Sequence, residues 1–169
     1  MRWGVRRVAT TRPYHRPGRS VRTATIAGAI IWYVERRTGP TLTVQRAAER
    51  FHTATDWLDS WHSFSFGPHH DPTNVGHGLL VVSNDDVIAP GTGFGTHPHR
   101  DMEILTWVLD GSLEHRDSEG NHGVLEPGLA QRMTAGRGIR HSEHNASRTV
   151  PLRLVQMWVL PDTPGLDPG

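Results

Sequence analysis

The sequence predicts an all-β protein, a sandwich or a barrel, over most of its 169 residues. Short runs rich in Val, Leu, Ile, Thr and Trp recur after residue 42, and such runs are typical of strands. Turn signals separate them, among them Asp110-Gly111 and Glu126-Pro127-Gly128. The length suits one ordinary domain with a tail.

Five strands are expected along this part of the chain: Gly78–Ser83, Glu103–Leu109, Ser112–Arg116, Leu129–Thr134 and Leu152–Leu160. Asp110-Gly111 predicts a two-residue hairpin turn, because glycine tolerates the positive φ that such a turn requires. One short helix is expected at Thr55–Ser60, where Thr55 or Asp56 could cap its first turn.

Charge divides the chain into two parts. All 18 basic residues are arginines, and nine of them precede Thr41, where Glu35 is the one acid (9 − 1 = +8). From Thr41 onward nine arginines face 16 acids, a balance of −7. We therefore expect residues 1–40 to be a basic, disordered N-terminal extension and residues 41–169 to form the domain.

Other interpretations of the extension are a transit or signal segment and a nucleic-acid-binding arm. Its apolar run, Ile26 to Val34, is about half the length that spans a bilayer. No aromatic residues alternate with the arginines as they do in many nucleic-acid-binding segments. We expect no nucleic-acid partner, no membrane partner and a cytoplasmic location.

Histidine is the residue type that carries the chemistry. The chain has 12 histidines and no cysteine, which excludes disulfides, thiolate metal ligands and a cysteine nucleophile. In an extended chain His97 and His99 project from the same face, and Pro98 between them stiffens the pair. His141 and Glu143 repeat this spacing about forty residues later.

Two strands that each present such a pair would provide three imidazoles and one carboxylate for a single divalent transition metal. Iron, nickel, cobalt, manganese, copper and zinc all suit these ligands. Glu103 competes with Glu143 as the carboxylate, since a strand continuing straight from His97 would put it on the same face. Eight of the other histidines are expected at the surface or hydrogen-bonded in the core: His52, His62, His69, His70, His77, His115, His122 and His144.

The two histidine segments resemble the motifs of the cupin superfamily. The matching positions are Gly91, His97, His99, Glu103 and Gly111 in the first motif, and Gly138, His141 and Asn145 in the second. Two features depart from the pattern. The last glycine of the first motif comes one place late, and Gly136 stands where cupins usually have proline.

The chain is more closely similar to one branch of that superfamily, the pirin family. Four stretches carry the similarity, which runs from Leu42 to about Pro164: residues 57–66, 82–88, 93–104 and 134–143. The resemblance implies a cupin jelly-roll barrel holding one metal ion, usually iron. It also implies the ligands His97, His99, His141 and Glu143, and thus favours Glu143 over Glu103.

Several pirins are similar to quercetin 2,3-dioxygenases, which open the ring of a flavonol with O2 and release carbon monoxide. The resemblance therefore implies a flavonol-like small-molecule substrate, with Glu143 as the catalytic residue, both metal ligand and proton acceptor. Phe94, Met133 and Trp107 are candidates for an apolar wall of the site, although ordinary core packing explains them equally well.

Other functions stay open at this point. Some pirins are regulators, so a non-catalytic, metal-bound, redox-sensing module is an alternative, as is a truncated, inactive fragment. A zinc hydrolase is disfavoured because no general-base motif accompanies the ligands. Pirins contain two cupin domains, whereas this chain ends soon after the first. We expect a homodimer through the surface that a second cupin would cover.

Overall fold

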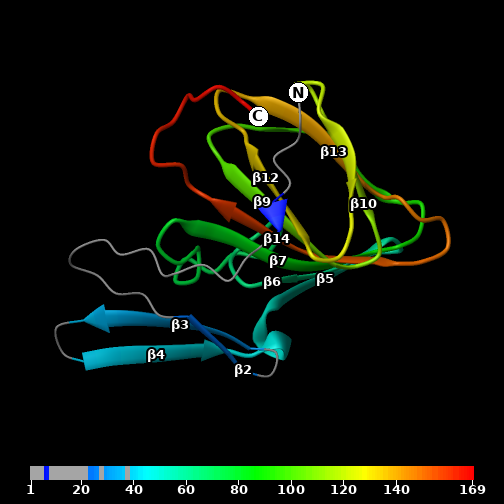
Figure 1. Ribbon diagram of the computed structural model, residues 1–169. Helices are drawn as coiled ribbons and strands as arrows, with labels where there is room; N and C mark the ends of the chain where they lie inside the picture. The colour runs from blue at the N-terminus through cyan, green and yellow to red at the C-terminus, as the bar shows by residue number, and fades with distance from the viewer. Residues whose placement is uncertain (1–5, 8–22, 27–28, 37–38) are drawn as a thin grey trace. The chain divides into compact units, whose positions relative to one another are not determined.

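The computed structural model describes residues 6–7, 23–26, 29–36 and 39–169, with side chains from residue 42 onward. The chain divides into two compact units (Figure 1). One comprises Met1–Val8 and Phe51–Gly169, and the other comprises Ala9–Arg50. The boundary expected between residues 40 and 41 stays a prediction.

The smaller unit contains a three-stranded antiparallel sheet in the order β2 (Thr23–Ile26), β3 (Ala29–Arg36) and β4 (Gly39–Gln45). A 3-10 turn, η1 (Ala47–Glu49), follows β4. The disorder expected for residues 1–40 falls largely on residues outside those described. Among the described residues, no helix has the length and apolar character needed to cross a membrane.

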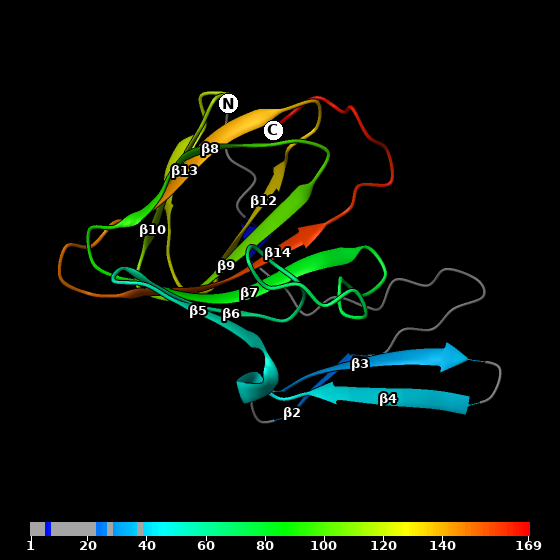
Figure 2. The same ribbon diagram turned by 180° about the vertical axis from the view of Figure 1, so that it is seen from behind.

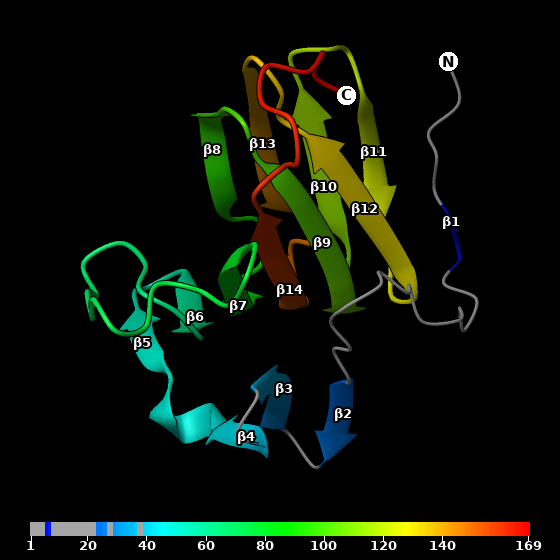
Figure 3. The same ribbon diagram turned by 90° about the vertical axis from the view of Figure 1, so that its left-hand side faces the viewer.

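The larger unit is built from two antiparallel sheets, which confirms the all-β prediction. The seven-stranded sheet has the order β1 (Arg6–Arg7), β12 (Leu129–Thr134), β9 (Glu103–Asp110), β14 (Leu152–Val159), β7 (Leu80–Ile88), β6 (Leu58–His62), β5 (Phe51–Ala54). The four-stranded sheet has the order β11 (His122–Leu125), β10 (Leu113–Asp117), β13 (Ile139–Asn145), β8 (Gly93–His99). Figures 2 and 3 show that this smaller sheet faces β12, β9 and β14 across the interior of a barrel.

Each of the five predicted strands is present. Leu129–Thr134 has the predicted ends, and the ends of the other four strands differ from the prediction by up to five residues. Gly111 has the expected positive φ, 79°, but the hairpin predicted at Asp110-Gly111 is wrong, because the turn leads from β9 in one sheet to β10 in the other and these two strands do not pair. The helix predicted at Thr55–Ser60 is wrong. The Thr55 hydroxyl caps a turn instead, accepting from the backbone N–H of Leu58 at 3.0 Å. Leu58 to His62 then forms β6, because those residues pair with β7 and bury alternate side chains.

The barrel interior contains two apolar clusters. One consists of Ile88, Val108, Leu113, Leu125, Leu152 and Leu154. The other consists of Ile104, Met133, Ala135 and Ile139. Each cluster excludes water from one region of the interior, and together they contribute most of the apolar burial that stabilises the barrel.

A row of buried polar side chains crosses the inner face of the seven-stranded sheet between these clusters. Its members are direct cross-strand neighbours: Gln131 pairs with Thr106, Thr106 with Gln156, Gln156 with Asn84 and Asn84 with His62. All five are buried. Buried polar groups are costly unless they are hydrogen-bonded, so a polar row inside a barrel indicates a site.

Candidate metal centre

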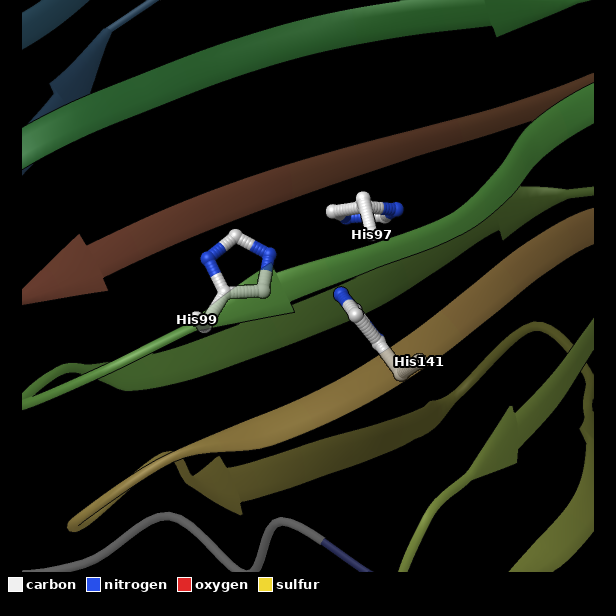
Figure 4. Close-up of side chains that lie close together, drawn as sticks. All are labelled: His97, His99 and His141. Atoms are coloured by element: carbon white, nitrogen blue, oxygen red, sulfur yellow. The ribbon is translucent and has the colours of Figure 1, made fainter.

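Strands β8 and β13 bring the three predicted histidines together. His97 lies directly opposite His141 across the strand pair, and His99 follows two residues later on β8. The ring centroids lie 4.8 Å apart for His97 and His99, 4.4 Å for His97 and His141, and 4.9 Å for His99 and His141. One nitrogen from each ring lies within 4.8 Å of the others. Figure 4 shows the three rings converging on a common space.

A β-bulge in β8 orients His97. The pairing passes from His141 opposite His97 to Glu143 opposite Phe94, so Gly95 and Thr96 together face one residue of β13. The bulge places the Gly95 carbonyl where it accepts a hydrogen bond from His97 Nδ1 at 2.7 Å. His97 Nε2 is therefore the nitrogen that is available to bind a metal.

Two of the three histidines have a buried nitrogen that nothing in the described part of the chain satisfies. These atoms are His99 Nε2 and His141 Nε2. Burial, followed by the charge of His97, lowers the pKa of His99 to about 4. Burial and the neighbouring histidines lower the pKa of His141 to about 2. Both rings are neutral at pH 7 and present free lone pairs, so these residues fit a transition-metal ion.

Glu143 lies beside this group and not within it. Its Oε2 is 3.9 Å from His141 Nε2. The carboxylate is not, however, among the ligand atoms of His97, His99 and His141 that all lie within 4.8 Å of one another. Gln156 Nε2 donates to both carboxylate oxygens, at 3.0 and 2.9 Å. Burial raises the pKa of Glu143 to about 7, although Gln156 acts against this shift. The role of Glu143 as fourth ligand stays a proposal.

The competing carboxylate, Glu103, lies elsewhere. Strand β8 ends at His99, and the chain turns at Asp101, which has a φ of 49°. Glu103 begins β9 in the other sheet, where it accepts from the Thr134 hydroxyl at 2.9 Å and lies 3.7 Å from Arg132. The straight strand that would have aligned Glu103 with the histidines does not form.

His115, which we expected to be an unremarkable core or surface histidine, contacts the site. It is buried on β10, directly opposite Glu143 of β13. Its Nδ1 lies 3.4 Å from His141 Nδ1, and its Nε2 lies 3.3 Å from Asp117 Oδ2. Burial lowers its pKa despite the opposing effect of Asp117. The His-x-Asp spacing on a predicted strand could have indicated the pair, but not its contact with His141.

A cavity of about 250 Å³ opens beside the histidines. Phe66, Phe94 and Trp158 form aromatic parts of its wall. Of the three apolar wall residues considered from the sequence, only Phe94 lines it. Met133 packs in a core cluster, and Trp107 is 40% exposed because β9 turns its neighbour Thr106 inward.

A jelly-roll barrel with three histidines converging in its interior defines a cupin. A solved cupin domain, that of Schizosaccharomyces pombe Cnp3, shares the fold with a TM-score of 0.55 at 11% identity and covers 80% of this chain. Residues 42–159 match the Pirin family. The chain therefore belongs to the pirin family of cupins.

Bacterial relatives match most of this chain. A Mycobacterium tuberculosis protein (strain H37Rv) is 62% identical over 126 residues, which cover 75% of this chain and 52% of the relative. Quercetin 2,3-dioxygenase of Escherichia coli K12 is 54% identical over 125 residues, which cover 74% of this chain and 54% of the relative. The crystal structure of the bacterial pirin YhhW from E. coli in complex with nickel(II) has a TM-score of 0.71 at 54% identity. The match covers 73% of this chain and 53% of the YhhW chain. The chain spans about half the length of the curated relatives it matches.

Proposed function

We propose that His97, His99, His141 and Glu143 hold one divalent transition metal and that the chain acts as a quercetin 2,3-dioxygenase-type oxygenase. The unsatisfied buried nitrogens of His99 and His141 support the metal. The nickel(II) complex of the E. coli pirin supports a divalent ion at 54% identity. Iron, the metal expected from the family, and nickel are both compatible with three imidazoles and a carboxylate.

The cavity beside the histidines is the observation that carries the catalytic proposal. Its lining includes His97, His99 and Glu143 together with the aromatic rings of Phe66 and Trp158. A purely structural metal would need no such space, whereas a flat aromatic substrate requires both apolar walls and access to the metal. The name of the E. coli relative supports a flavonol as that substrate.

A metal bound here would act as a Lewis acid and lower the pKa of a substrate hydroxyl. In this proposal Glu143, which lines the cavity, accepts that proton at a carboxylate oxygen. In the metal-free protein burial raises the pKa of Glu143 to about 7, and a bound divalent cation would lower it, which favours the ionised, proton-accepting form. Gln156 holds both oxygens in place, and the indole N–H of Trp158 donates to Gln156 Oε1 at 3.0 Å. The aromatic wall excludes water from the reacting end of the substrate.

Quercetin turnover tests this proposal. The purified chain, its metal content measured by elemental analysis, is mixed with quercetin in air, and loss of the flavonol's visible absorbance and carbon monoxide release are followed. We expect turnover in proportion to bound metal and none after chelation. A chain that binds metal stoichiometrically but leaves quercetin intact would overturn the catalytic proposal and favour a regulatory module.

A further inference from the structure

The cavity has a second polar wall, away from the histidine-bearing strands. It consists of two cross-strand pairs on the inner face of β6 and β7, Ser60 opposite Asp86 and His62 opposite Asn84. All four side chains are buried. No metal-binding role accounts for them, because the histidines of the proposed metal site lie on β8 and β13.

Asn84 is the unsatisfied member of this wall. Its side chain is 6% exposed and lines the cavity, and its Oδ1 has no hydrogen-bond partner in the described part of the chain. An amide oxygen buried in this way destabilises the folded state unless a partner arrives. The cavity in front of it is where that partner would bind.

The chemistry of the wall indicates what the partner provides. Asp86 and Glu143 are buried acceptors, and their available donors are already used: the Ser60 hydroxyl donates to Asp86, and Gln156 donates to Glu143. Among the described residues, no arginine lines the cavity. At the β6–β7 wall a ligand that presents O–H donors is therefore favoured, whereas an anionic group there would meet the Asp86 carboxyl with no arginine of the described residues beside it.

The apolar part of the cavity favours a flat ring between the two polar regions. Phe66 and Trp158 meet edge to face with ring centroids 5.6 Å apart, and Phe94 packs edge to face against Trp57 at 5.2 Å. Aromatic walls of this kind hold an aromatic ligand by stacking and edge contacts.

We propose that the β6–β7 wall is a second substrate subsite that binds hydroxyl groups of a polyphenol remote from its metal-binding end. Asn84 Oδ1 accepts from one such hydroxyl, and Asp86 provides the next acceptor. The inference rests on the proposed function and narrows its substrate class to flavonols with a hydroxylated pendant ring. A flavonol without those hydroxyls would leave Asn84 unsatisfied and bind less tightly.

The test uses three flavonols with the same fused-ring system and zero, one or two hydroxyls on the pendant phenyl ring. Their dissociation constants for the metal-loaded full chain are measured by absorbance titration. We expect the dihydroxylated flavonol to bind about tenfold tighter than the unsubstituted one, the effect of about one good hydrogen bond. In Asn84→Leu this preference should fall to within about twofold, because the variant has no amide oxygen to accept from the pendant-ring hydroxyl, and metal content should be unchanged.

Asp86→Asn gives a second, milder change at the wall, and Asp85→Asn is its matched control. Asp85 is the adjacent residue on β7 and pairs with Arg153 at 3.0 Å, so its variant should keep the wild-type preference. Equal affinity of the wild type for all three flavonols would overturn the subsite while leaving quercetin turnover intact. An unchanged preference in both Asn84→Leu and Asp86→Asn would overturn it as well. If the metal-loaded chain binds no flavonol, both the subsite and the proposed function are wrong.

Discussion

The imidazole rings of His115 and His141 meet inside the barrel with their Nδ1 atoms 3.4 Å apart. His115 Nε2 lies 3.3 Å from Asp117 Oδ2, so an N–H there donates to the carboxylate and leaves His115 Nδ1 as an acceptor. His141 Nδ1 must then carry the proton, and the lone pair of His141 Nε2 faces the other histidines. Asp117 thus selects the tautomer that a metal ligand requires.

Asp117→Asn should therefore weaken metal binding about tenfold to a hundredfold. Its amide Nδ2 cannot accept from His115, whereas its Oδ1 can still accept from the backbone N–H groups of Glu119 and Asn121, which stabilise the turn. Metal titration with a competing chelator measures the affinity, and the melting temperature should change little. Glu119→Gln, on the same turn, is the control. Wild-type affinity in Asp117→Asn would show that the His115 contact does not orient His141.

His97, His99 and His141 should each be required for metal retention. Replacing any one with alanine removes one of three converging nitrogens, so most of the bound metal should be lost while the β content stays close to wild type. Elemental analysis and circular dichroism measure the two properties. The control is His122→Ala, which replaces an exposed histidine on β11, and this variant should keep the metal content of the wild type. Full metal content in His97→Ala would contradict the proposed site.

The sequence predicted the strand-rich body and the shared face of His97 and His99 because each depends on local pattern. Alternation places His97 with His99 on one face whatever the rest of the chain does. The helix expected at Thr55–Ser60 failed for the opposite reason, since pairing of Leu58 to His62 with β7 is a tertiary contact. Cross-strand pairing overrides a weak local helix preference.

The cavity wall and the His115 contact could not be predicted in the same way. Asn84, Gln156 and Thr106 are far apart in sequence and become neighbours only through the strand order β7, β14, β9. The separation of Glu103 from the histidines likewise depends on one turn at Asp101. A single sequence shows which residues share a strand face, but not which strands are adjacent.

Asp86 should make the metal-free protein less stable as pH rises. Burial raises its pKa from 3.8 to about 6, so the folded state favours the protonated carboxyl. The resulting stabilisation is complete below about pH 4 and is lost as pH rises through 6. A difference of about two pKa units corresponds to about 3 kcal/mol.

Asp86→Asn removes this titration and keeps the side-chain shape. The free energy of unfolding of the metal-free wild type, relative to that of the variant, should therefore fall by up to about 3 kcal/mol between pH 4 and 7. Comparing the two proteins cancels the opposing titrations of His99 and His141. Urea unfolding at several pH values measures the difference. A constant difference across this range would show that Asp86 is not held in a desolvated site.

The carboxylate that completes the metal site can be identified by a pair of matched variants. Glu143→Gln should weaken metal affinity and abolish quercetin turnover, because an amide is a poorer donor and cannot accept the substrate's proton. The Gln156 amide still has an oxygen to donate to in this variant, so the fold should persist. Metal titration and the quercetin assay measure the two effects.

Glu103→Gln should leave both properties near wild type. Glu103 lies on β9 with Thr134 and the largely exposed Arg132, so the variant should lose less than about 1 kcal/mol of stability. The proposal that Glu143 is the fourth ligand rests on its proximity, because Glu143 Oε2 lies 3.9 Å from His141 Nε2. Glu103 would have to leave its strand partner to reach the same point. If Glu103→Gln strips the metal and Glu143→Gln retains it, the site follows the general cupin arrangement and the assignment of Glu143 is wrong.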